Sequence, residues 1–170
     1  FIATRAQPEL AQNSSEYIAE FPEDREEAFS YDLVILGDVD SSFFSAEALL
    51  RLEELVKERG GSLLMLCGSR FAPASYAGTP VERMLPVEFD PEADWEDVDD
   101  SVYPVLTPEG RSSLVMTLEN DQDENDLVWS RVAPLDRIPP LLAPRPGATV
   151  LAELSDTLSR ADRYPLVSWQ

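Results

Sequence analysis

The sequence predicts an α/β fold with a parallel sheet, and three observations lead to that prediction. Residues 31–36 and 63–67 form two short, nearly continuous apolar runs, the pattern of strands that are buried on both faces. Between them, residues 45–59 space their apolar side chains along one stripe of a helix. The joints are short, so we expect a right-handed strand–helix–strand crossover between parallel neighbours.

Local signals mark the boundaries of this unit. Gly37 ends the first apolar run and Gly68 closes the second. Ser45 is a residue type that caps helix N-termini, and Gly60-Gly61 supplies the left-handed backbone that ends a helix. The apolar stripe of the helix consists of Ala48, Leu49, Leu52, Leu55 and Val56, whereas Arg51, Glu53, Glu54, Lys57 and Glu58 are expected to face water.

The flanking segments carry weaker signals. Residues 4–30 predict loop with one short helical turn, and a short helix is expected near 81–85. Residues 88–100 hold eight carboxylates in thirteen positions, which predicts an exposed loop. Further along, we expect a strand at 102–106, a helix at 125–132, an extended or turning proline-rich stretch at 134–146, a strand at 148–152 and the start of a strand at 166–169.

The chain is strongly acidic. Its 170 residues include 33 Asp and Glu against 13 Lys and Arg, giving a formal net charge of −20. Nucleic acid and anionic membrane surfaces would repel such a chain, so we predict no nucleic-acid partner and no direct membrane contact by this segment. The length suits a single domain over 1–170, and both ends look cut, which indicates a fragment of a larger protein.

Several segments together resemble a known family. They are residues 31–39, the helix that ends at Gly60-Gly61, 64–68, 76–80, 85–87, 107–110, Trp129 and 146–153. They resemble a class I glutamine amidotransferase-like domain of the kind embedded in large bacterial membrane-anchored proteins with von Willebrand factor A modules. The resemblance implies a flavodoxin-like fold of three layers, α/β/α, around a mainly parallel sheet whose end strands lie outside this chain. It also implies a parent protein anchored in the bacterial cell envelope.

The resemblance makes Cys67 the position equivalent to the nucleophile of active relatives. There, a cysteine lies on a tight turn between glycines, a histidine takes its proton, and backbone amides hold the oxyanion. Here Met65 and Ser69 replace the glycines, Asp38 and Asp40 follow the preceding strand, and the sequence contains no histidine. Nearby carboxylates raise a thiol pKa. We therefore predict a degenerate active site with no catalytic residue and a structural Cys67.

Asp38 and Asp40 are also weak candidates for a divalent metal, because they follow a strand at the edge where parallel sheets present ligands. The motif that begins at Asp40 misses the last serine of a von Willebrand metal site, so a polar loop is the favoured interpretation. Asp121 begins a run like a calcium loop, but Asp126 and Val132 do not fit its sixth and twelfth positions. We predict no metal and no other cofactor.

Three functional hypotheses follow. The first is a non-catalytic interaction or scaffolding domain with a degenerate amidotransferase-like fold, whose partners are other proteins or other domains of the same chain. The second is a small-molecule or divalent-metal binding module that uses the edge around Asp38, Asp40, Cys67 and Ser69. The third is a residual glutaminase or hydrolase completed by residues outside this chain. The first is favoured, since the chain offers no proton acceptor of the histidine type.

Overall fold

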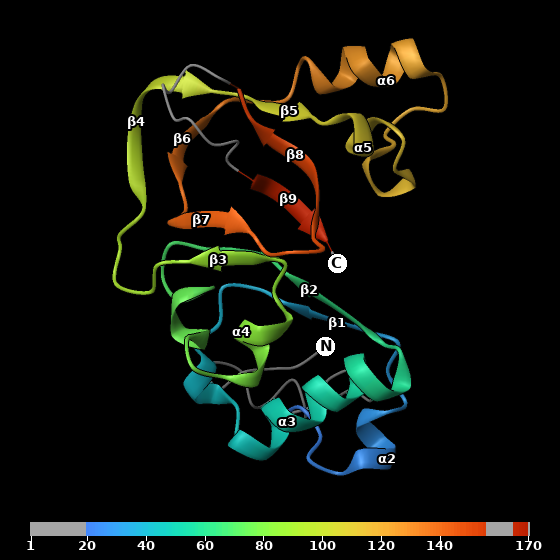
Figure 1. Ribbon diagram of the computed structural model, residues 1–170, viewed down its shortest axis with the longest axis vertical. Helices are drawn as coiled ribbons and strands as arrows, with labels where there is room; N and C mark the ends of the chain where they lie inside the picture. The colour runs from blue at the N-terminus through green and yellow to red at the C-terminus, as the bar shows by residue number, and fades with distance from the viewer. Residues whose placement is uncertain (1–19, 156–164, 170) are drawn as a thin grey trace, which may run out of the picture. The chain divides into compact units, whose positions relative to one another are not determined.

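The computed structural model describes residues 20–155 and 165–169, and for residues 99–101 it describes the backbone alone. The chain divides into two compact units, the first ending at Met84 and the second beginning at Leu85 (Figure 1). The expectation of a single domain over 1–170 stays a prediction.

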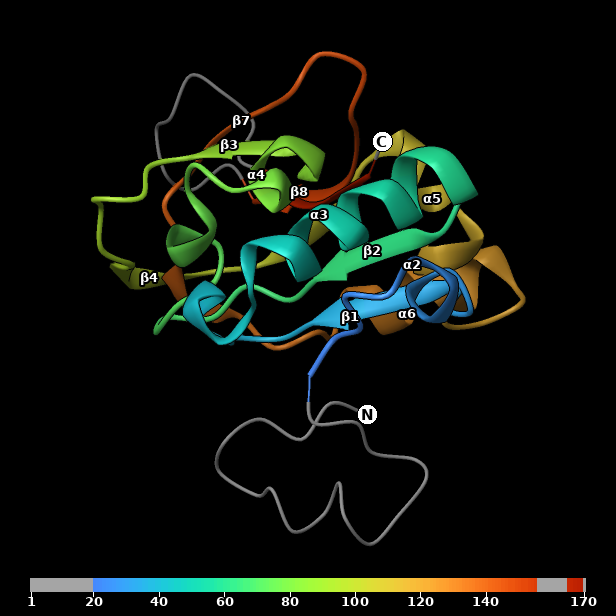
Figure 2. The same cartoon turned by 90° about the horizontal axis from the view of Figure 1, so that it is seen from below.

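The first unit contains the expected strand–helix–strand arrangement. Strands β1 and β2 pair in parallel, with Ile35 opposite Leu64, and α3 lies beside them (Figure 2). The Ser45 hydroxyl accepts a hydrogen bond from the Ala48 amide at 3.1 Å, and Gly60 ends the helical segment with φ of 81°. The elements are α2 (Arg25–Ala28), β1 (Leu33–Leu36), η1 (Ser41–Phe43), α3 (Ala46–Glu54), the π-helical η2 (Leu55–Arg59), β2 (Ser62–Met65), η3 (Ala74–Tyr76) and α4 (Pro80–Met84).

The expected burial of both strand faces is wrong. Val34 and Leu36 are buried, whereas Leu33 and Ile35, which alternate with them, are exposed. A continuous apolar run contains no polar residues to mark a solvent-facing side, so the sequence pattern could not separate the two faces. The apolar stripe of the helix is confirmed, since its buried members are Ala48, Leu49, Leu52 and Leu55.

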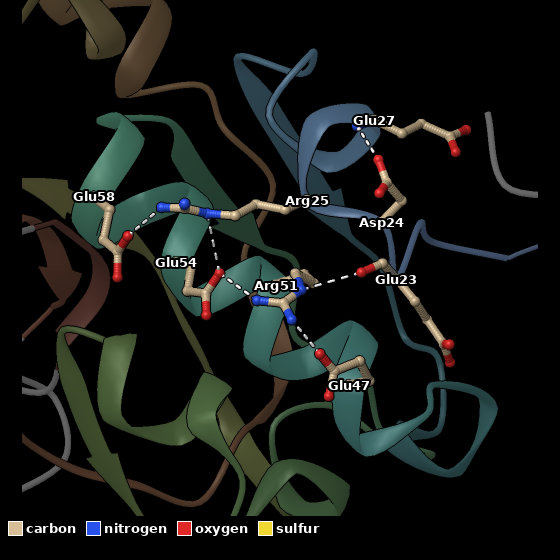
Figure 3. A network of polar contacts seen from close by, with 8 residues as sticks. All are labelled: Glu23, Asp24, Arg25, Glu27, Glu47, Arg51, Glu54 and Glu58. Atoms are coloured by element: carbon tan, nitrogen blue, oxygen red, sulfur yellow. Dashed lines mark hydrogen bonds and ion pairs between the residues drawn. The ribbon is translucent and has the colours of Figure 1, made fainter.

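A polar network holds the segment before β1 against α3 (Figure 3). Arg51 donates to the backbone carbonyl of Glu23 at 3.1 Å and to the carboxylate of Glu54 at 2.5 Å. Arg25 of α2 pairs with the same Glu54 at 3.6 Å and with Glu58 at 2.6 Å. Exposed ion pairs contribute at most about 1 kcal/mol each. The main consequence of the network is therefore positional, because it fixes where α2 lies.

The second unit is built from short antiparallel sheets. Strand β3 pairs with β7, β4 pairs with β6, and β8 lies between β5 and β9. Its core cluster combines Leu106, Met116, Leu151 and Ala152. The elements are β3 (Val87–Phe89), β4 (Glu96–Val102), β5 (Pro104–Leu106), α5 (Pro108–Arg111), η4 (Leu114–Met116), α6 (Gln122–Trp129), β6 (Leu135–Ile138), β7 (Leu141–Pro144), β8 (Thr149–Leu154) and β9 (Pro165–Trp169).

The expected three-layer α/β/α architecture with a mainly parallel, flavodoxin-like sheet is wrong. Within the described residues, β1 and β2 are the only parallel pair, and the other three sheets are antiparallel. Parallel neighbours need a long crossover, usually a helix. In the part of the chain that the structure describes, β1 and β2 are the only paired strands whose direct connection is helical, and that connection consists of η1, α3 and η2.

The expected loop at 88–100 is also wrong, because β4 begins at Glu96. Asp97 of β4 is exposed, as expected, but it lies in a paired strand and forms a cross-strand ion pair with Arg137 of β6 at 2.7 Å. Helix α6 begins at Gln122, before the expected residue 125, because the Asp121 carboxylate caps it. The strand expected at 148–152 is confirmed as β8. None of the described helices is long and apolar enough to cross a membrane.

Gly110 permits the close approach of α5 to β8. A Cβ added at Gly110 would lie 1.9 Å from the carbonyl oxygen of Leu151. We expect Gly110→Ala to lower the free energy of unfolding by about 1–3 kcal/mol, because backbone must shift to admit the methyl group. Thermal unfolding followed by circular dichroism measures the change. Gly37→Ala, whose Cβ would meet no atom within 4 Å, is the control, and equal melting of the two variants would contradict this packing.

Candidate functional site

The candidate site lies beyond the ends of β1 and β2. Asp38 follows β1 after Gly37, and Cys67 and Ser69 follow β2. Because the two strands are parallel, both chain segments leave the sheet at the same edge. Direct hydrogen bonds join the Asp38 side chain to the segment after β2.

The Asp38 carboxylate accepts hydrogen bonds from three consecutive backbone amides of that segment. Its Oδ1 accepts from Phe71 at 2.8 Å and from Ala72 at 2.9 Å, and its Oδ2 accepts from Arg70 at 3.2 Å. The side chain packs directly over Gly68, where an added Cβ would lie 2.2 Å from the Asp38 Cγ. The Gly68 amide in turn donates to the Ala72 carbonyl at 3.0 Å, which closes the loop around the carboxylate.

These contacts set the charge state of Asp38. Desolvation of the carboxylate raises its pKa, but the amides of Ala72, Phe71 and Arg70, together with the Arg70 charge, outweigh that effect and hold the pKa below its ordinary value. Asp38 is therefore ionised at neutral pH, and both of its oxygens already accept hydrogen bonds. In the residues that the structure describes, no group of three or more potential metal ligands comes together.

Asp40 serves the neighbouring backbone in a similar way. Its Oδ1 accepts from the Ser42 amide at 2.9 Å and so caps η1. The Ser41 amide then donates to the Ser75 hydroxyl at 3.1 Å, and the Ser41 hydroxyl donates to the Ser75 carbonyl. Each candidate metal ligand thus binds backbone amides, which is the bonding pattern of a polar loop.

Cys67 is an exposed residue that follows β2. Desolvation raises the pKa of the Cys67 thiol, and the charge of Asp38 raises it further, so the thiol is protonated at neutral pH. No described residue other than glycine has a positive φ, and Cys67 therefore does not lie on a left-handed, strained turn. The three amides of residues 70–72 bind Asp38 instead of standing open for an oxyanion.

Tyr76, at the start of the segment 76–80, is a residue of this region to which the sequence assigned no functional role. Its side chain is fully buried, and its hydroxyl has no hydrogen-bond partner within the described residues. Desolvation, followed by the charges of Asp40 and Asp38, raises the pKa of Tyr76 to about 12. Tyr76 follows an irregular stretch with no periodic apolar pattern, so no sequence signal pointed to its burial.

The second unit holds a cavity of about 310 Å³ that the sequence analysis did not predict. Two carboxylates and two threonine side chains contribute to its lining, which consists of Thr107, Glu109, Pro144, Ala148, Thr149, Val150 and Glu153. The Thr107 hydroxyl is engaged, since it donates to the Val150 carbonyl at 2.7 Å. The lining brings together none of the predicted site residues. Asp121, the first residue of the calcium-like run, instead caps α6 by accepting from the Asp123 and Glu124 amides.

The Asp38 contacts generate a pH-dependent prediction for stability. We expect Asp38→Ala to lower the free energy of unfolding by about 1–3 kcal/mol at neutral pH, because three backbone donors lose their acceptor. The folded-state pKa of Asp38 is lowered, so its stabilisation is present above the unfolded-state pKa and is lost as the pH falls through the folded-state pKa. Urea unfolding from pH 7 to pH 3 measures the difference between the variant and the wild type.

That difference should shrink toward the acidic end of the series. Asp38→Asn keeps the size and one acceptor oxygen, so its loss should be smaller than that of Asp38→Ala. Asp94→Ala, at an exposed position of the second unit, is the matched control and should change the unfolding free energy by less than about 0.5 kcal/mol. A pH-independent difference for Asp38→Ala would contradict the assigned charge.

The thiol environment generates a second prediction. Cys67 is the only cysteine in the chain, so alkylation by iodoacetamide reports on it alone. We expect the pH midpoint of its labelling rate to lie above that of a free cysteine, because desolvation and the Asp38 charge raise the pKa of the thiol. Asp38→Asn should move the midpoint downward. Fast labelling at neutral pH with a midpoint below that of free cysteine would refute an inert thiol.

Comparison with known proteins gives a fold likeness and no family. No family model matches the chain, and no curated protein matches it. Cytoplasmic protein STM3548 from Salmonella typhimurium has a similar structure, with a TM-score of 0.64 and 21% identity over 89% of this chain and 63% of that one. Cytoplasmic protein STM1381 from Salmonella typhimurium LT2 gives 0.59 and 23%, over 87% and 59% respectively.

The chain thus spans about three fifths of the length of each of these two structures. At such identities the likeness concerns the fold alone. The expected membership of the class I glutamine amidotransferase-like family is wrong: no family model matches, these structures are named only as cytoplasmic proteins, and the described sheets are mostly antiparallel. The segments that suggested it were short apolar runs and glycine turns, which are weakly specific.

Proposed function

We propose that this chain is a non-catalytic domain that binds another protein, and one observation carries the proposal. The first unit exposes an apolar sheet face formed by Leu33 and Ile35 of β1 and by Leu64 and Leu66 in and just after β2. Between 45% and 56% of each of these residues is exposed. We call these four residues the outer face of β1–β2.

The strand register makes this face continuous. Ile35 lies opposite Leu64, and side chains two residues apart in a strand point to the same side. The Leu66 amide donates to the Leu36 carbonyl at 2.8 Å, so the chain after β2 still runs alongside β1. Residues that alternate with the outer face, such as Val34 and Leu36, are buried. The four exposed side chains therefore form one patch.

An amphipathic helix of the partner protein fits this patch best. Parallel strands are rarely left bare on one face, and helices are what usually cover them. The opposite face of the β1–β2 pair is the inner one, and α3 is the neighbouring helix on that side. The apolar side of α3 consists of the buried residues Ala48, Leu49 and Leu52. Each Å² of apolar surface left in water costs about 25 cal/mol, so a helix with similar apolar spacing gains free energy by covering the outer face.

The chemistry at the ends of these strands favours binding over catalysis. The sequence contains no histidine, and the Cys67 thiol is held in its protonated form. The Asp38 carboxylate is occupied by backbone amides. A general base for nucleophilic attack is therefore hard to assign in this region.

The test is selection of helical peptides by the whole chain. A displayed library of 18-residue peptides with apolar residues at helical spacing is bound to the wild type, and the dissociation constants of selected peptides are measured. We expect Ile35→Thr combined with Leu64→Thr to raise these constants at least about tenfold, because threonine suits a strand but removes apolar contact. Circular dichroism verifies that the variant stays folded.

Two further variants sharpen the result. Leu50→Ser combined with Leu142→Ser changes two exposed leucines elsewhere and should leave binding within about twofold of the wild type. Cys67→Ser should also leave it unchanged, because the proposed function uses no thiol chemistry. Selection of no helical peptide, or equal binding by the Ile35→Thr/Leu64→Thr variant, would contradict the proposal.

A further inference from the structure

We infer that the second unit carries a separate binding surface for a short peptide segment that combines apolar and basic side chains. The surface consists of Leu114, Val115 and Leu118, which we call the Leu114 patch. These residues are 90%, 71% and 54% exposed, respectively. They lie in η4 and just after it, in the connection between α5 and α6 (Figure 1). The inference does not rest on the proposed function, because it concerns other residues in the other unit.

The backbone beneath the patch is fixed by side chains of α6. The Trp129 indole donates to the Met116 carbonyl at 2.9 Å. The Asn125 carbonyl oxygen, in a buried side chain, accepts from the amides of Leu118 at 2.8 Å and of Glu119 at 3.2 Å. The Met116 side chain belongs to the core cluster of the unit. The segment is thus anchored at Met116, Leu118 and Glu119.

This anchoring explains why the patch stays exposed. Met116 already occupies the inward position, so Leu114, Val115 and Leu118 cannot turn into the core without breaking the bonds to Trp129 and Asn125. Single exposed apolar residues are ordinary, but three on one fixed five-residue segment form a preorganised apolar surface. A ligand that binds there loses little free energy to ordering of this chain, since the backbone is already held in place.

The acidic residues that follow the Leu114 patch favour a ligand with basic side chains. Four exposed acids follow it within the next six residues: Glu119, Asp121, Asp123 and Glu124. The cation just before it, Arg111, already pairs with Asp126 at 2.5 Å. An acidic segment would be repelled, whereas Lys or Arg beside an apolar side chain meets opposite charge. Three side chains give far less area than the roughly 1,200 Å² of a stable protein interface, so the fitting ligand is a short segment bound transiently.

The experiment uses the whole chain and the five-residue peptide Lys-Leu-Lys-Leu-Lys. A peptide of this length is far too short to form a stable helix, which separates this surface from the outer face of β1–β2. Backbone amide shifts in nuclear magnetic resonance spectra are followed as peptide is added. We expect saturable shifts at residues 114–119. Leu114→Ser combined with Val115→Ser should abolish them, whereas the control Leu50→Ser/Leu142→Ser should keep them.

Two matched peptides decide the chemistry. Lys-Ser-Lys-Ser-Lys tests charge alone, and Glu-Leu-Glu-Leu-Glu tests apolar contact without basic charge. For both peptides, the dissociation constant measured from the shifts at residues 114–119 should be at least about tenfold higher. Equal shifts with the serine peptide would overturn the inference, because they would show general attraction to an acidic chain. Equal shifts with the glutamate peptide, or unchanged binding by the Leu114→Ser/Val115→Ser variant, would overturn it as well.

Discussion

The carboxylate of Asp38 is the interaction on which the end of the parallel pair depends. It joins the segment after β1 to the segment after β2 by accepting from three consecutive amides, those of Arg70, Phe71 and Ala72. Backbone donors in such a loop need acceptors, and an ionised acceptor forms stronger hydrogen bonds than a neutral one. Gly68 leaves the space that the carboxylate fills. One side chain therefore determines the path of the whole loop.

The same interaction limits what the strand ends can do chemically. A loop of converging amides next to a cysteine is the arrangement from which an oxyanion site could be built. Here the amides already donate to the Asp38 carboxylate, and the charge of that carboxylate also raises the pKa of the neighbouring Cys67 thiol. The charge that organises the loop thus opposes both a developing oxyanion and a thiolate. Structural and catalytic demands on these residues conflict, and the observed hydrogen bonds satisfy the structural one.

The parts of this structure that the sequence predicted are those set by local chemistry. Ser45 and Gly60 mark the helix ends because capping and left-handed backbone depend on the residue itself. Asp38 was placed at the correct edge because parallel strands end together. Its partners at 70–72 donate through backbone amides, which every residue but proline carries, so no sequence signal could identify them. The sequence did not predict the antiparallel pairing of β4, because the exposed carboxylates of this strand resemble those of a loop.

The two exposed apolar surfaces are best understood together with the charge of the chain. Apolar faces such as the outer face of β1–β2 and the Leu114 patch invite association between copies. A net charge of −20 opposes that association, because two copies repel each other before their apolar faces meet. The same charge attracts a basic partner and speeds its encounter. The negative charge therefore opposes contact between the apolar surfaces of two copies and favours the approach of basic molecules to these surfaces.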